Sequence, residues 1–170
     1  MRVLVLLAFA VILGVPAAHA GCPKVKVIDD PFGGTQSRTI NTTLGWVESK
    51  GGTLTLKSGL TMGGASGVEI PSGFQFELKM ADDSTVTLNT LATSVPTSQA
   101  TQYGVYTSWN FQYGITLEQL EKLATVDTTA TRSKPVLNPD SPEYAVNVMS
   151  AKQKKKIRAT MTCALEMAKG

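Results

Sequence analysis

Alternation of apolar and polar side chains with a period of two is the feature that most constrains this chain, because it selects strands over helices. In residues 74–80 a large apolar side chain occupies every second position, with polar side chains between. The pattern returns in residues 85–91, after a turn at Asp82-Asp83, and again in residues 102–113 with aromatic side chains. These segments predict an antiparallel hairpin and a further long strand, each with one wet face.

The remaining strands are predicted from shorter stretches of the same kind. They cover residues 24–28, 44–48, 53–57, 128–132 and 143–149. The strands at 44–48 and 53–57 are joined through Ser49-Lys50-Gly51-Gly52, which has the composition of a turn. Three segments have the composition of loops: the glycine-rich residues 58–67, the Ser/Thr-rich residues 93–101 and the proline-rich residues 134–142.

Two helices are predicted from their start signals. Thr116 with Gln119, and Ser150 with Gln153, have the spacing of a capping box, in which each side chain satisfies a backbone N–H of the other residue. Apolar side chains at helical spacing follow both signals. The helices are expected at about 116–125 and 150–168. The fold class predicted is therefore α+β, a β-rich antiparallel sheet or sandwich packed with two helices.

Residues 1–20 have the three parts of a secretion signal. Arg2 precedes an apolar run over residues 3–15, Pro16 interrupts it, and Ala18-His19-Ala20 places small residues where signal peptidase cleaves. The run is too short to cross a membrane as a helix, which takes about 20 residues. The sequence thus predicts a single exported domain over residues 21–170, periplasmic or secreted, with no transmembrane segment after cleavage. Lipidation of Cys22 is an alternative that the sequence leaves open.

Removal of the signal also removes the only histidine, His19. A histidine-free domain excludes Ser-His-Asp and Cys-His catalysis, and with two cysteines it excludes the usual zinc sites. We therefore predict no catalytic residues, no metal and no cofactor. A hydrolase that uses carboxylates or a Ser-Lys pair is the alternative enzyme class, although no motif points to one.

The two cysteines, Cys22 and Cys163, lie near opposite ends of the mature domain. Outside the cytoplasm, an even number of cysteines favours a disulfide. Cys163 falls opposite the apolar stripe of the last helix, so we expect it to face outward and the segment carrying Cys22 to cross over that helix. The alternative is two unpaired thiols.

Two surfaces are candidates for binding. The first is the aromatic strand, where Tyr106 lies off the main face and Trp109 or Tyr113 is expected to be partly exposed; aromatic residues are frequent in recognition surfaces. Its alternative is a simple core face. The second is a basic run at the start of the last helix, suited to an anionic surface, whose alternative is a solvated helix face. Its members are Lys152, Lys154, Lys155, Lys156 and Arg158. No aromatic residue is interleaved there, so no nucleic acid is expected as partner.

The chain also resembles a loose group of small exported bacterial proteins of unknown function. The resemblance rests on the turn Asp30-Pro31-Phe32-Gly33-Gly34, a hairpin turning at Asp83-Ser84, and a Tyr-x-Ile-Thr-x-Glu-Gln-Leu-Glu-Lys-Leu-Ala segment over residues 113–124. A strand ending in Arg132 and a C-terminal helix bearing a cysteine complete it. The resemblance implies a β-rich domain outside the cytoplasm and carries no catalytic residues.

These observations favour an uncharacterised exported domain that is not an enzyme and that binds a protein or surface ligand. The alternative from another class is an envelope-associated protein that contacts anionic surfaces through its basic C-terminal helix.

Overall fold

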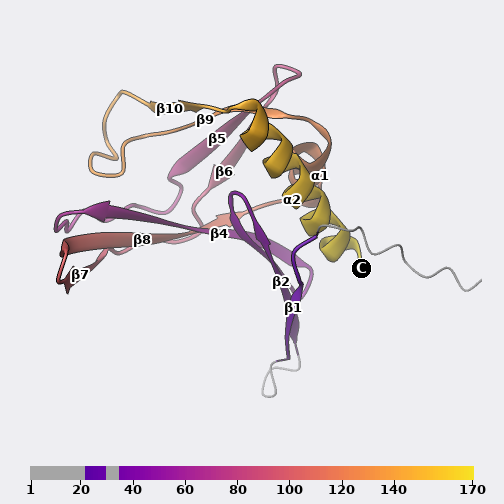
Figure 1. Ribbon diagram of the computed structural model, residues 1–170, viewed down its shortest axis with the longest axis horizontal. Helices are drawn as coiled ribbons and strands as arrows, with labels where there is room; N and C mark the ends of the chain where they lie inside the picture. Colours follow the sequence, from indigo (N-terminus) through magenta and orange to yellow (C-terminus); the bar gives the residue numbers. More distant parts are fainter. Residues whose placement is uncertain (1–21, 30–34) are drawn as a thin grey trace, which may run out of the picture.

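The computed structural model describes residues 22–29 and 35–170. Within this part of the chain, ten strands form two antiparallel sheets and two helices pack beside them (Figure 1). The predicted α+β class is therefore confirmed. The predicted secretion signal and the turn at residues 30–34 lie outside the described residues.

The larger sheet has six strands in the order β1-β2-β3-β4-β8-β7. These strands span Lys26–Asp29 (β1), Gln36–Thr42 (β2), Gly45–Lys50 (β3), Thr53–Gly63 (β4), Thr97–Thr101 (β7) and Gly104–Gly114 (β8). The predicted turn at Gly51 and Gly52 joins β3 to β4, and both glycines have a positive φ, of 55° and 79°. Because L side chains rarely adopt that conformation, glycine is the residue that lets this hairpin close tightly.

The smaller sheet has four strands in the order β10-β9-β5-β6. These strands span Gln75–Met80 (β5), Thr85–Asn89 (β6), Thr128–Ser133 (β9) and Ala145–Val148 (β10). The predicted hairpin of residues 74–91 is β5–β6, and alternate side chains of β5, Leu78 and Met80, are buried. Their polar neighbours Glu77 and Lys79 lie on the opposite face of the sheet, as the alternation predicts.

Both helices begin at the predicted caps. Helix α1 spans Leu117–Thr125 and helix α2 spans Ala151–Lys169. In each, the hydroxyl of the capping residue accepts a hydrogen bond from the N–H of the glutamine three residues later. The glutamine side chain in turn accepts one from the N–H of the capping residue, which completes both capping boxes.

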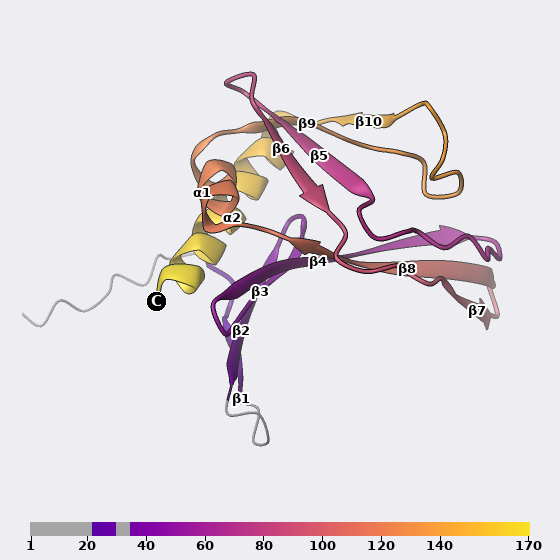
Figure 2. The same cartoon turned by 180° about the vertical axis from the view of Figure 1, so that it is seen from behind.

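The core lies between the two sheets and is closed at one end by the helices. Helix α2 packs against α1, β2, β3 and β9, while the β7–β8 turn lies at the opposite end of the molecule (Figures 1 and 2). The large side chains that are fully buried come from both sheets and both helices. They include Trp109, Leu78, Leu88, Leu120, Leu123, Ile157 and Met161.

The predicted disulfide between Cys22 and Cys163 is present, with 5.6 Å between the two Cα atoms. It ties the segment before β1 to the last turns of α2. Cys163 itself is buried, although its position on the helix predicts an outward direction. This burial agrees with the expected crossing, because the disulfide holds the Cys22 segment over Cys163, and Cys22 and Val25 pack against the core.

The structure differs from the sequence prediction in three strands. Residues 58–63, within the segment 58–67 predicted as a loop, form the second half of β4, which pairs with β8 as far as Gly63 opposite Tyr106. Residues 97–101 lie in the predicted loop 93–101 but form β7 against the other edge of β8. β2 lies where apolar alternation is too weak to predict a strand. In all three, hydrogen bonding to a neighbouring strand overrides local composition.

Candidate binding site at the edge of the smaller sheet

The smaller sheet turns one face away from the core. Its register places two rows of side chains on this outer face. One row runs Thr87, Glu77, Arg132 and Val146, and the other runs Thr85, Lys79, Ala130 and Val148. We call the surface that these rows form the outer face.

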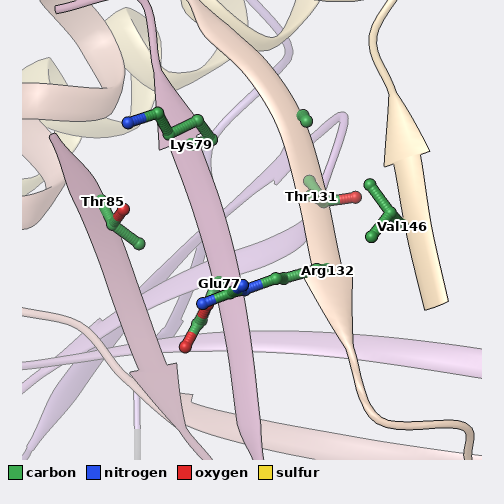
Figure 3. A pocket seen from close by; sticks show the side chains of 7 residues that line it. Glu77, Lys79, Thr85, Thr131, Arg132 and Val146 are labelled. Atoms are coloured by element: carbon green, nitrogen blue, oxygen red, sulfur yellow. The ribbon is translucent and has the colours of Figure 1, made fainter. Parts of the chain in front are cut away.

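A hollow of about 440 Å³ lies in the outer face (Figure 3). It is open at this position because Ala130 and Thr85 are short, while longer side chains stand around them. Figure 3 shows the side chains of Glu77 on β5 and Arg132 on β9 meeting between these two strands. Val146 lies beyond β9, on the neighbouring strand β10. A hollow of this volume falls within the range of sites that take up a ligand or part of a bound partner.

The charges around the hollow are balanced by one another. Arg132 donates a hydrogen bond from Nε to the carboxylate of Glu77, and this bond raises the pKa of Arg132. The guanidinium also lies 4.8 Å from the centre of the Tyr144 ring, within the range of a cation–π contact. Lys79 Nζ lies 3.3 Å from Asp83 Oδ1. The hollow therefore presents apolar and polar surface without a free charge at its centre.

Strand β10 forms the open edge of this sheet and exposes two apolar side chains. Val146 is 62% exposed and Val148 is 74% exposed. The N–H of Met149 donates a hydrogen bond to Thr129 O at 2.9 Å, so the backbone polar groups of Met149 point toward β9. Backbone groups in antiparallel pairs alternate between the partner strand and the opposite side. Val146 and Val148 accordingly direct their own N–H and C=O groups toward the open edge.

Four other edges in the described residues differ from β10. The second half of β4 extends beyond its pairing with β3, which ends at Lys57, but its large side chains Leu60 and Met62 are half-buried. β1 also exposes two apolar side chains, Val27 and Ile28, but it carries the charges of Lys26 and Asp29, and charges at an edge discourage pairing with another chain. β7 has the sequence TSQAT, without a large apolar side chain. β6 is partly covered by α1, because the Gln119 side chain donates to Thr87 O at 3.0 Å. β10, with the sequence AVNV, combines an open edge with exposed valines and has no charge or proline.

The predicted aromatic surface is not assembled. Trp109 is fully buried, with Nε1 donating to Val68 O at 2.8 Å, and Tyr113 is only 4% exposed. Burial raises the pKa of Tyr113 to about 12, partly offset by its hydrogen bond with Ser58. The expected exposure of these two residues is therefore wrong, because their face of β8 is the one that packs on the core. Tyr106 lies on the opposite face and is 38% exposed.

In the predicted basic run, Arg158 differs from the four lysines in its contacts. Arg158 Nη1 lies 3.1 Å from Asp127 Oδ1, so this cation is engaged in an ion pair within the fold. Lys152, Lys155 and Lys156 are exposed, and Lys154 is half-buried. In the described part of the chain, no carboxylate lies within ion-pairing distance of these four lysines.

Sequence reasoning misses the two residues that distinguish the site, Val146 and Val148. The strand has apolar residues on both of its faces, with Ala145 on one and Val146 and Val148 on the other. Such a pattern predicts that both faces are buried. The ion pair of Glu77 with Arg132 is also missed, because the two residues lie on strands far apart in the sequence. A signal that could have helped is the absence of charge from β10.

The described residues contain no group of three or more His, Cys, Asp or Glu side chains placed to hold a metal ion. Among them, no helix is long and apolar enough to cross a membrane. A comparison with protein-family models, with curated proteins and with solved structures finds no match.

Proposed function

We propose that this protein is an exported domain, not an enzyme, that binds a protein partner by taking up one of its extended segments as a new strand beside β10. The observation that carries the proposal is the open edge of β10, with Val146 and Val148 exposed. In strand addition, main-chain hydrogen bonds supply affinity and pockets for alternate side chains supply specificity. A long side chain of the added strand that crosses β10 would enter the hollow beside Val146.

Export is supported by two independent features. Residues 1–20 have the pattern of a secretion signal, and Cys22 is disulfide-bonded to Cys163. Disulfides persist mainly in oxidising compartments such as the periplasm or the cell exterior. The partner is accordingly expected to be a protein of the same compartment.

The test is photo-crosslinking in the producing cell. A photoreactive amino acid replaces Val148 in one variant and Gln99, on the exposed edge strand β7, in the matched control. The expected result is a discrete adduct at position 148 that is absent at position 99 and is lost when Val146→Lys is added. Equal labelling at both positions, no adduct at 148, or an adduct of only twice the protein's own mass would contradict the proposal of a separate partner.

A further inference from the structure

We propose that the segment bound at β10 is acidic, with carboxylates at the end that lies beside the start of α2. This inference rests on the proposed function and names the chemistry of its partner. Lys152, Lys155 and Lys156 would receive the carboxylates, while uncharged residues of the segment pair with Val146 and Val148.

The fold holds the lysines at a fixed place relative to the β10 edge. Only Met149 and Ser150 separate β10 from α2. Met149 is buried and bonded to Thr129 O, and Ser150 is fixed by its capping box with Gln153. A bound strand advances about 3.3 Å per residue. A segment only a few residues longer than β10 therefore reaches the first turn of α2.

Within the described residues, no carboxylate pairs with the lysines at this position. The sequence KQKKK spans residues 152–156, and the first turn of α2 contains no acidic residue. The positive end of the helix dipole adds to the same field, since it lies at the N-terminus. Like charges gathered at a positive helix end are mildly destabilising. Carboxylates of a partner would relieve that repulsion.

β10 alone offers little binding energy, and this makes the lysines important. The strand has four residues, of which Val146 and Val148 direct backbone groups outward. So short an edge forms few backbone hydrogen bonds, and each contributes little net free energy because it replaces a hydrogen bond to water. Complementary charge beside the edge would add affinity, accelerate association and fix the direction of the bound segment.

A peptide fits the site better than a membrane surface. The open edge of β10 carries backbone N–H and C=O groups that must be hydrogen-bonded, and hydrocarbon offers them no partner. An extended peptide satisfies these groups directly. The hollow beside Val146 also offers such a peptide a recess of about 440 Å³.

The experiment uses the mature, disulfide-bonded protein and three synthetic peptides. Each has a centre of alternating threonine and valine, flanked on both sides by glutamate, glutamine or lysine. Fluorescence anisotropy gives the affinities, and amide hydrogen exchange at Val146 and Val148 reports strand addition. The variant Lys152→Gln/Lys155→Gln/Lys156→Gln removes the basic cluster. The control Lys24→Gln/Lys26→Gln/Lys50→Gln removes three exposed lysines elsewhere.

The glutamate peptide is expected to bind roughly tenfold more tightly than the glutamine peptide, since several exposed ion pairs with the lysines each add a small contribution. This preference should weaken with salt, disappear in the α2 variant and persist in the control. A glutamine or lysine peptide that binds as tightly would overturn the inference, as would a preference that survives in the α2 variant. Binding to anionic phospholipid vesicles, with no binding of the glutamate peptide, would overturn it in favour of a membrane surface.

The same data separate this inference from the proposed function. If all three peptides slow exchange at Val146 and Val148 equally, strand addition stands and the acidic preference fails. If none of them slows exchange at these two amides, both fail.

Discussion

At the scale of single residues, the role of each aromatic side chain depends on the face of the strand from which it projects. Trp109 and Tyr106 lie on the same strand, β8, three positions apart and on opposite faces. The first is fully buried and donates a hydrogen bond to Val68 O, whereas the second is 38% exposed. The face of the strand that packs on the core therefore sets what each aromatic side chain contributes.

We expect Trp109→Ala to lower the free energy of unfolding by about 3–5 kcal/mol, because it leaves a cavity and an unsatisfied carbonyl. Tyr106→Ala, the matched control on the same strand, should change it by less than about 1 kcal/mol. Chemical denaturation monitored by circular dichroism measures both. Similar losses in the two variants would contradict the assignment of faces.

The ionised carboxylate of Asp82 makes the stability of the fold depend on pH in the acid range. Hydrogen bonds from Lys122 and Ser84 lower the pKa of Asp82 to about 2. In the unfolded chain the pKa of an aspartate is about 3.9. Because the folded value is the lower one, this group stabilises the fold above pH 4 and the contribution is lost as the pH falls toward 2.

The free energy of unfolding of Asp82→Asn should therefore depend less steeply on pH between 4 and 2 than that of the unchanged protein. Denaturation series at several pH values measure this slope. Asp140→Asn, in the loop before β10, removes an exposed carboxylate that lacks the Lys122 contact and is the control. A slope in Asp82→Asn as steep as in the unchanged protein would exclude the coupling.

At the scale of secondary-structure elements, the sequence predicts those elements whose signals are local. Both helices carry complete capping boxes, and the β5–β6 hairpin carries strict alternation with an acidic turn. β2, β7 and the second half of β4 depend instead on pairing with strands elsewhere in the chain. The exposure of β10 is hidden for a related reason, since a run of apolar residues looks the same whether or not another strand covers it.

The turn between β2 and β3 gives an element-scale prediction. Gly45 has a φ of 139°, and a Cβ added there would lie 2.1 Å from the backbone oxygen of Lys57. Gly45→Ala should cost about 2–3 kcal/mol, because neither backbone can move aside freely. Gly52→Ala, at a φ of 79° with open space around it, should cost only about 1–2 kcal/mol. Thermal or chemical unfolding ranks the two variants, and equal losses would argue against close packing of β3 on β4.

At the scale of the whole molecule, one covalent bond joins the two ends of the domain. The disulfide connects residues 141 positions apart, so it closes nearly the entire described chain. In the chain-entropy model, a loop of this length restricts the unfolded ensemble by about 4–5 kcal/mol. The disulfide is thus comparable with the whole stability of an ordinary domain, about 5–15 kcal/mol.

Replacing both Cys22 and Cys163 with serine should lower the free energy of unfolding by about that amount. Denaturation curves with and without reductant measure the effect, and the double variant should be insensitive to reductant. A difference below about 1 kcal/mol would show that the N-terminal segment is held by packing rather than by the covalent bond.

The most direct test of β10 as the recognition edge is amide hydrogen exchange at Val146 and Val148. It should be measured on the protein recovered with its bound partner, and again after the partner has been removed. We predict slow exchange of these two amides in the complex and fast exchange in the free protein. Equally fast exchange in both states would mean that no strand is added at β10, and the partner would have to be sought on another surface.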